Sequence, residues 1–349
     1  MAKADKLVES TIEFTQSRMN SFLTCPRKEF FEYRCQGCGV RPKRTETYFL
    51  EGEFGHYALK HWYTSKLMLR ANLIKRVDAS LKALGDMEPE VYEDYQRRMS
   101  AMIGACHAYK AHYTKDHDAF NIIGVEQPFE VVIGKFKFRG RLDLLLEDKK
   151  DKTIGFMEHK FMSQFSNELY ASLPLNLQQL LYSLGFEAIT GKKPNWYRWN
   201  VIKKSQLRRK GMKPTKEQRF PHPESLIEFE SRVQNQYMEE PDDMFFRPAP
   251  RKVERAALDA VQDSVLNWME VWEAMVAKGT LPPMCFTSCD GKYNNPCTYG
   301  PACIAAMTKG GEGWNAPECQ GMYVKKTVLH PELEEKDDKE DKPAKPASK

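Results

Sequence analysis

The sequence predicts an α/β fold in which a strand-rich middle region lies between two helical regions. Apolar residues recur at spacings of three and four before and after the middle region, which is the period of an amphipathic helix. The middle region instead contains two apolar runs joined by a charged turn, which is typical of a β-hairpin. With 349 residues and 41% hydrophobic content, the chain can bury the core of one large domain or two.

Helical patterns come first and run over about residues 51–83 and 89–113. Strands are expected over about residues 122–161. They are followed by an amphipathic stretch over residues 174–189, where leucines recur on one helix face. The predicted order is therefore helices, then strands, then helices again.

The last predicted helix ends at Gly279. Its apolar stripe consists of Leu258, Val261, Val265, Trp268, Trp272 and Met275. Such a stripe is far more often core than function, so we expect it to be buried. Residues 331–349 combine dense mixed charge with proline and lack aromatic side chains, and we predict a disordered tail there.

Composition limits the function classes. The sequence has no apolar stretch of about 18 residues, and its first ten residues, MAKADKLVES, lack the apolar segment of a signal peptide, so we expect a cytoplasmic protein with no membrane partner. A net charge of +5 allows a nucleic-acid partner without requiring one. Nine cysteines without a secretion signal indicate reduced thiols or metal ligands rather than disulfides.

The hairpin at residues 140–161 carries charges where buried strands are expected. Asp143 lies inside its first apolar run, and Glu158 and Lys160 lie inside the second. Burying an ionised carboxylate costs several kcal/mol unless another group compensates it. Since strand side chains alternate, Glu158 and Lys160 share one face, and a turn over residues 147–153 brings Asp143 opposite Glu158 or its neighbour.

Two adjacent carboxylates repel each other unless a cation or a lysine lies between them. A divalent-metal site supplies such a cation, so the hairpin predicts metal-assisted hydrolysis. The alternative is a two-sided hairpin whose charges face solvent.

Five short motifs follow one another along the chain. They are GEFGH at 52–56, GVE at 124–126, GRLD at 140–143, EHK at 158–160 and QQLLY at 178–182. Their order resembles that of the RecB-like branch of the PD-(D/E)XK nucleases, over roughly residues 17–305. Each motif alone is short, but five in one order rarely occur by chance.

The resemblance implies a restriction-endonuclease-like fold, in which helices flank a mixed central sheet. It implies a single nuclease domain over residues 1–330. The core of that domain is expected at about 122–205, a helical insertion at about 57–120, and a C-terminal helix with a cysteine-rich segment at about 254–320.

The resemblance also implies a metal site for Mg²⁺ or Mn²⁺. Asp143 and Glu158 would bind the ion, with the backbone carbonyl of His159 as a further ligand and His56 completing the site. Lys160 would orient the attacking water and offset charge on the phosphate, while the metal lowers the pKa of that water.

Three assignments near this site have alternatives. Gln178 and Tyr182 lie four residues apart on one helix face and are expected to point at the charged end of the hairpin, although routine surface packing would give the same pattern. Glu126 is a further candidate for the site, or else an exposed strand carboxylate. A lone histidine such as His56 is more often structural than a ligand.

Four cysteines form a second constellation, one early in the chain and three late. They are Cys25, Cys289, Cys297 and Cys303. This arrangement resembles the iron–sulfur variety of the family, which includes AddB and the CRISPR-adaptation nucleases, and it implies a [4Fe–4S] cluster joining the N- and C-terminal segments. The family often has two residues between the first two late cysteines, where this chain has seven, so Cys285 or Cys319 could replace one ligand.

Cys35 and Cys38 form a separate CxxC motif. Alone it is compatible with zinc, a redox pair or two surface thiols. If it binds zinc, it needs two more ligands, for which Cys285 and Cys319 are the unassigned thiols.

A basic run at residues 203–219 has eight basic residues against one acid, directly after three aromatic residues at positions 196, 197 and 199. Cations attract phosphates and aromatic rings stack on unpaired bases, so this segment suits single-stranded nucleic acid. The candidate binding residues are Lys203, Lys204, Arg208, Arg209 and Lys210. The alternative is a solvated loop that follows a buried strand.

These observations predict a metal-dependent DNA exonuclease used in recombination, repair or phage DNA processing. Its partners would be single-stranded DNA or duplex ends, together with a recombination or helicase protein. The alternative is a non-catalytic, DNA-binding iron–sulfur subunit of a recombination complex. A helicase fusion is excluded, because residues 185–192 do not have the spacing of a phosphate-binding loop.

Overall fold

The computed structural model describes residues 12–43, 47–84, 88–172, 176–211, 223–289, 296–330 and 333. The predicted tail at 331–349 therefore lies outside the described residues, apart from Leu333. The chain forms two compact units. The terminal unit comprises Met1–Lys43, Val132–Gly140 and Leu266–Lys349, and the central unit comprises Arg44–Val131 and Arg141–Val265.

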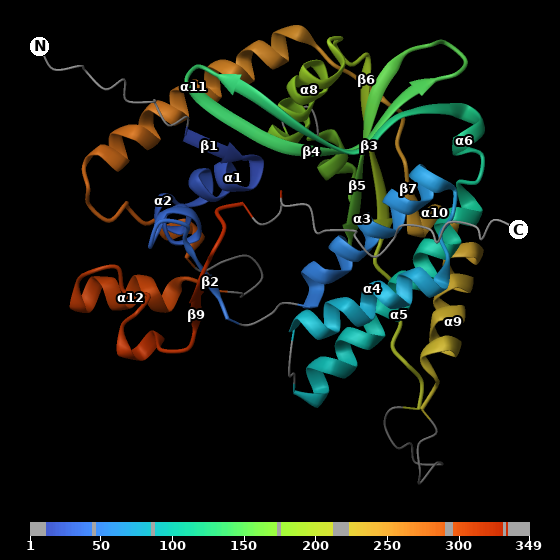
Figure 1. Ribbon diagram of the computed structural model, residues 1–349, viewed down its shortest axis with the longest axis horizontal. Helices are drawn as coiled ribbons and strands as arrows, with labels where there is room; N and C mark the ends of the chain where they lie inside the picture. Colours follow the sequence, from blue (N-terminus) through green and yellow to red (C-terminus); the bar gives the residue numbers. More distant parts are fainter. Residues whose placement is uncertain are drawn as a thin grey trace, which may run out of the picture. The chain divides into compact units, whose positions relative to one another are not determined.

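The central unit is built on a mixed sheet (Figure 1). Its strands are β3 (Phe120–Ile133), β4 (Phe136–Asp148), β5 (Ile154–Met162), β6 (Trp196–Lys203), β7 (Phe245–Phe246) and β8 (Arg251–Lys252). β4 and β5 form an antiparallel hairpin, whereas β5 and β6 are parallel and are connected through a helix. The predicted α/β class with a mixed central sheet is confirmed.

Side chains of β5 alternate between two cores, as the sequence predicted. Phe156 packs with Phe186 and Tyr197 on one face of the sheet. Its neighbour Met157 belongs to the larger cluster on the other face. Consequently Glu158 and Lys160 emerge on the face of Phe156.

Helices cover both faces of this sheet. On the face of Met157 lie α3 (Thr47–Ser65), α4 (Arg70–Leu84), α5 (Pro89–His112) and α9 (Leu226–Glu239). The opposite face is covered by α8 (Leu177–Thr190), whose Phe186 ring is 6.1 Å from that of Phe156. Asn176 caps α8 by accepting the backbone N–H of Gln178, and Gly191, at φ 67°, ends the helix.

Short elements around the sheet complete the central unit. They are α6 (Asp116–Ala119), α7 (Asn167–Ala171) and α10 (Pro241–Met244). None of the helices in the described part of the chain is long and apolar enough to cross a bilayer.

The terminal unit joins the two ends of the chain. Its main elements are β1 (Ile12–Thr15), α1 (Gln16–Thr24), α2 (Pro26–Glu29), β2 (Val40–Pro42), α12 (Gly300–Lys309) and β9 (Tyr323–Lys325). β2 pairs with β9, and β1 pairs with the first residues of β4. The Tyr299 ring stacks between Phe31 and Tyr323, at centroid distances of 5.4 and 5.7 Å.

The predicted C-terminal helix is α11 (Arg255–Ala277). Leu258, Val265 and Trp272 of the predicted stripe are buried. Trp268 is 47% exposed, and Met269 is buried instead. At 100° per residue, position 268 falls at the edge of the apolar stripe, which explains why this prediction was wrong.

Candidate active site

Asp143 and Glu158 lie side by side in the β4–β5 hairpin. The register places Leu144 opposite Met157, so the two carboxylates occupy neighbouring positions on the paired strands. Oδ2 of Asp143 accepts the backbone N–H of His159 at 2.7 Å. Both acidic side chains are almost fully buried. Their burial excludes the solvated hairpin that the sequence left open.

His56 and Glu126 complete a cluster around Asp143. Nδ1 of His56, on α3, lies 3.3 Å from Oδ1 of Asp143 and 3.7 Å from Oε1 of Glu126, on β3. One ligand atom from each of the three residues lies within 4.8 Å of the others. Carboxylate oxygens and one imidazole nitrogen suit Mg²⁺ or Mn²⁺.

The backbone of Glu126 adopts φ 50°, which is unusual for a residue other than glycine. Such a conformation costs about 1–3 kcal/mol and persists where the surroundings fix it, often at functional sites. The side chain is also 3.9 Å from Nη1 of Arg141, a neighbour that the sequence did not indicate. The structure thus places Glu126 in the cluster rather than on an open strand surface.

Lys160, Glu158 and Gln178 form a closed hydrogen-bonded triangle. Nζ of Lys160 donates to Oε1 of Glu158 at 2.9 Å and to Oε1 of Gln178 at 2.7 Å, and Nε2 of Gln178 donates to Glu158 at 2.8 Å. Both bonds to Glu158 end at its Oε1. Its Oε2 is buried and has no hydrogen-bond partner among the described residues.

An orphaned buried carboxylate oxygen is costly unless a cation lies beside it. The donor set of His56, Glu126 and Asp143 therefore fits a divalent metal ion. The unpaired Oε2 of Glu158 is a further candidate ligand.

The pKa values of the two hairpin carboxylates are driven apart. Burial and the nearby Asp143 raise the pKa of Glu158 to about 8. Burial also acts to raise the pKa of Asp143, but attraction to His56 outweighs it and lowers that pKa to about 2. Burial acts to lower the pKa of His56, yet Asp143 and Glu126 together raise it to about 10. Strongly perturbed groups in contact with one another are typical of functional sites.

Tyr182 closes the site from α8. Its ring packs edge-on against Phe129 at a centroid distance of 5.3 Å. Burial raises the pKa of its hydroxyl, and the negative charges of Glu158, Asp143 and Glu126 act in the same direction. Gln178 thus hydrogen-bonds to Lys160 and Glu158 at the charged end of the hairpin, whereas Tyr182 packs on Phe129.

A family model described as the PD-(D/E)XK nuclease superfamily matches residues 13–303. The chain belongs to this superfamily. The match includes every residue of the cluster described above. Among curated proteins, no sequence matches the chain.

Behind the nuclease site lies a buried polar network that the sequence did not predict. Nδ2 of Asn200 donates to Nδ1 of His159 and to the hydroxyl of Tyr109, both at 2.8 Å. Nε of Arg247 donates to Oδ1 of Asn200 at 3.0 Å, and its Nη1 donates to Oδ1 of Asp116 at 2.7 Å. These residues come from five separate segments without a shared motif, so no local signal could have identified them.

The four candidate iron–sulfur cysteines lie in the terminal unit. Burial raises the pKa of Cys303 to about 11, against the lowering effect of Arg27 and with smaller contributions from Cys297, Cys25 and Cys289. Sγ of Cys25 also accepts the backbone N–H of Cys285 at 3.4 Å. The quartet is less compact than the nuclease cluster, which alone among the described residues brings three His, Cys, Asp or Glu ligand atoms within 4.8 Å.

The other cysteines of the terminal unit contact different groups. Cys35 lies 3.4 Å from a carboxylate oxygen of Glu312. Sγ of Cys285 is 3.1 Å from the hydroxyl of Thr287. Cys38 is half-buried and Cys319 is fully buried. No described contact joins Cys35 and Cys38 to Cys285 and Cys319 as a zinc site would require.

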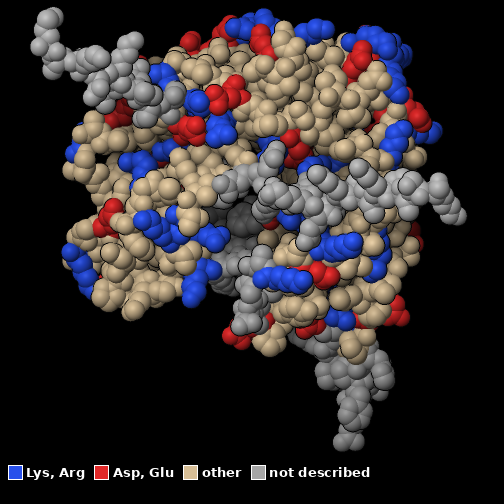
Figure 2. Space-filling model, in the orientation of Figure 1, with Lys and Arg blue, Asp and Glu red and all other residues tan. Residues whose placement is uncertain are grey.

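The candidate DNA-binding cations differ in their surroundings. Nζ of Lys204 lies 2.7 Å from Oε2 of the buried Glu51. Arg209 donates to the backbone carbonyl of Glu224, whereas Arg208 and Lys210 are exposed. Residues 212–219 of the basic run lie outside the described residues. Basic and acidic side chains are interspersed over the face shown in Figure 2, which therefore carries no continuous basic surface.

The aromatic residues before the basic run lie in β6. Trp196, Tyr197 and Trp199 are all buried. Stacking on DNA requires an exposed ring, so these three side chains serve the core. This outcome matches the alternative of a buried strand.

Proposed function

We propose that the protein is a metal-dependent DNA exonuclease that hydrolyses phosphodiester bonds. The carrying observation is the cluster in which Asp143, Glu126 and His56 converge, together with the buried, unpaired Oε2 of the neighbouring Glu158. A lysine is held against that cluster. Metal-dependent phosphodiester hydrolysis needs these same parts.

Asp143, Glu158 and His56 would hold Mg²⁺ or Mn²⁺, with Glu126 and the backbone carbonyl of His159 as further ligands. When bound, the ion lowers the pKa of water and polarises the scissile phosphate. His56 must release its proton before Nδ1 can bind a metal.

Lys160 is the positioned cation of the site. Its ammonium is fixed by Glu158 and Gln178, so it can orient the attacking water and offset charge that develops on the phosphate. Tyr182, half-buried on α8 and packed on Phe129, would limit access of bulk water to the site. Arg141 holds Glu126 from the other side.

The proposal includes a structural [4Fe–4S] cluster on Cys25, Cys289, Cys297 and Cys303. Its support is the proximity of the other three thiols to Cys303. We further propose single-stranded DNA or duplex ends as substrates and a cytoplasmic role in recombination, repair or phage DNA processing, alongside a recombination or helicase partner.

End-labelled single- and double-stranded DNA and RNA, incubated with Mg²⁺, Mn²⁺ or EDTA, test the activity and its polarity. We expect metal-dependent DNA cleavage that EDTA abolishes. Release of mononucleotides from an end would support an exonuclease. Internal fragments would replace it with an endonuclease.

Asp143→Asn and Lys160→Ala should each lower the cleavage rate about a thousandfold, because several kcal/mol of metal or transition-state stabilisation is lost. The matched control is Asp263→Asn, an exposed carboxylate on α11. Circular dichroism should show that all three variants are folded. Near-parental cleavage by either site variant would contradict the assignment.

A further inference from the structure

His159 connects the carboxylate cluster to the opposite face of the sheet. Its backbone N–H donates to Oδ2 of Asp143 at 2.7 Å, whereas Oδ1 of Asp143 lies 3.3 Å from Nδ1 of His56. Because strand side chains alternate, the buried ring of His159 emerges on the face opposite to that of Glu158. Whatever holds this ring therefore also holds the backbone group that orients Asp143.

Two neighbours hold the ring of His159. The ring of Tyr63, on α3, stacks on it at a centroid distance of 5.6 Å and an interplanar angle of 15°. Nδ2 of Asn200 donates to its Nδ1 at 2.8 Å, and Asn200 is directly opposite His159 in the parallel β5–β6 ladder. Asn200 is completely buried. The ring is thus fixed both across its face and at its Nδ1 edge.

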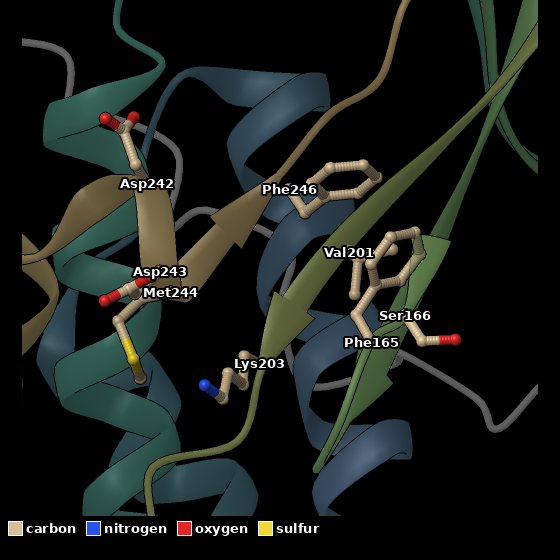
Figure 3. A pocket seen from close by; sticks show the side chains of 8 residues that line it. All are labelled: Phe165, Ser166, Val201, Lys203, Asp242, Asp243, Met244 and Phe246. Carbon is tan, nitrogen blue, oxygen red and sulfur yellow. The ribbon is translucent and has the colours of Figure 1, made fainter. Parts of the chain in front are cut away.

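Asn200 points away from the pocket beside β6. Figure 3 shows this pocket, of about 360 Å³, with Val201 and Phe246 among its lining residues. Since side chains alternate along a strand, Asn200 emerges on the other face, where its Nδ2 also donates to the hydroxyl of Tyr109 on α5. Of the hydrogen-bond partners described for Asn200, His159 is the one that contacts Asp143. Any effect of Asn200 on the site is therefore expected to act through His159.

Arg247 determines which way the amide of Asn200 points. A guanidinium has no acceptor, so the atom of Asn200 that lies 3.0 Å from Nε of Arg247 must be Oδ1. Nδ2 consequently faces Nδ1 of His159. Because an amide nitrogen only donates, Nδ1 has to accept, and the proton of the imidazole lies on Nε2. The position and the tautomer of His159 thus follow from Arg247.

Two tyrosines complete the network. The hydroxyl of Tyr109 accepts from Nδ2 of Asn200 at 2.8 Å and from Nη2 of Arg247 at 2.7 Å. Its own proton is therefore directed to the hydroxyl of Tyr63 at 2.6 Å, and Tyr63 donates to Oδ2 of Asp116 at 2.6 Å. The guanidinium of Arg247 only donates and the carboxylate of Asp116 only accepts, so each of these bonds has one direction. A buried network satisfied in this way holds its members in one arrangement.

We propose that Asn200 is a positioning residue, which holds His159 and thereby Asp143 in the arrangement that binds the metal ion. The proposal rests on the proposed metal-dependent nuclease function. Arg247 orients Asn200, Asn200 holds the ring of His159, and the backbone of His159 fixes Oδ2 of Asp143. Oδ1 of Asp143 then stays on the side of His56. Asn200 itself contacts neither metal nor DNA, so its effect is on the affinity for the metal.

Titration of the DNA-free protein with Mn²⁺, followed by calorimetry, tests the proposal. Asn200→Leu keeps the approximate size of the side chain without its polar atoms, and it should raise the Mn²⁺ dissociation constant about 10- to 100-fold. Asp143→Asn should lose this binding, which identifies the measured site. Val233→Ala is the control, because it truncates a buried residue of α9 and destabilises the fold, yet should leave the dissociation constant unchanged.

His159→Phe tests the same connection from the other side. It keeps a ring to stack on Tyr63 but has no Nδ1, and it leaves the bonds of Arg247 in place. It therefore carries the test even if Asn200→Leu does not fold. We expect a similar rise in the Mn²⁺ dissociation constant. The double variant should bind Mn²⁺ no more weakly than the weaker of the two single variants, because both changes remove the same hydrogen bond.

An unchanged Mn²⁺ dissociation constant in either folded variant would overturn the proposal, as would effects that add in the double variant. Circular dichroism establishes which variants are folded, and DNA cleavage with Mn²⁺ is measured in parallel. A parent that cleaves DNA, with variants that bind Mn²⁺ equally well, would refute the positioning role and leave the nuclease intact. Weakened Mn²⁺ binding in both variants of a parent that never cleaves would refute the nuclease and leave the positioning role.

Discussion

Glu126 is the residue whose role depends most on its three-dimensional setting. Its carboxylate faces His56 at 3.7 Å and Arg141 at 3.9 Å, and its backbone is held at φ 50°. We expect a strained residue in a ligand cluster to affect the affinity for the metal ion rather than the rate of hydrolysis once the metal is bound.

Glu126→Gln should therefore raise the Mn²⁺ concentration needed for half-maximal cleavage about 10- to 100-fold, as loss of a supporting metal-site residue typically does. The rate at saturating Mn²⁺ should recover. The measurement is cleavage rate against Mn²⁺ concentration, with Glu130→Gln on the same strand as the control. An unchanged Mn²⁺ dependence would make Glu126 an ordinary strand carboxylate.

Sequence reasoning located most of the site because its parts are close in the chain. Asp143, Glu158 and Lys160 share one hairpin, and Gln178 begins the next long helix, so strand alternation and helix spacing were enough to bring them together. The assignment of His56 and Glu126 to the site depended instead on the order of the sequence motifs. Arg247 could not be predicted, since its partners are distant in sequence and no periodicity links them.

At the level of elements, the network behind β5 fixes the strand that carries the site. Arg247 and Asp116 form an ion pair at 2.7 Å in which both side chains are only 9% exposed. Asn200 connects this pair to the ring of His159. Removing one partner of a buried pair leaves the other charge uncompensated.

Arg247→Met should lower the free energy of unfolding by about 3–5 kcal/mol. The control is Arg255→Met, because its ion pair with Asp259 has the same 2.7 Å distance but side chains that are about half exposed. That variant should lose no more than about 1 kcal/mol. Urea denaturation measures both, and equal losses would show that the network contributes no more than a surface pair.

The basic run after β6 contains two kinds of side chain. Lys204 is paired with a buried carboxylate, whereas Arg208 and Lys210 are exposed. Arg208→Gln/Lys210→Gln should weaken binding of single-stranded DNA and reduce the slope of log K against log salt by about 1.4, because each neutralised phosphate of a single strand contributes about 0.7. Lys204→Gln should instead destabilise the fold through loss of its pair with buried Glu51. An unchanged salt slope in the double variant would assign the run to a solvated loop.

For the whole molecule, periodicity predicted the order of helices and strands but not the division into two units. β2 and β9 have three residues each, which is too short for any hydrophobic pattern, yet they pair the two ends of the chain. The stacking of Phe31, Tyr299 and Tyr323 is equally invisible in sequence. Only the cysteines indicated that these ends meet.

A cluster on those cysteines would close a loop that contains almost the entire chain. Cys25 precedes the nuclease site, and Cys289, Cys297 and Cys303 follow it. Closing so long a loop restricts the unfolded chain, and binding that occurs only in the folded state adds to stability. Anaerobically purified protein should therefore be brown and contain iron and sulfide.

Cys303→Ala should lose colour and iron and should unfold at a lower urea concentration than the parent. Cys106→Ala, which truncates a buried cysteine of α5, is the control and should stay brown, as should Asp143→Asn. Colourless protein with stoichiometric zinc would replace the cluster by a zinc site. Colourless, metal-free protein of undiminished stability would make the quartet ordinary packing residues, because β2, β9 and the aromatic stack would then suffice to hold the two ends together.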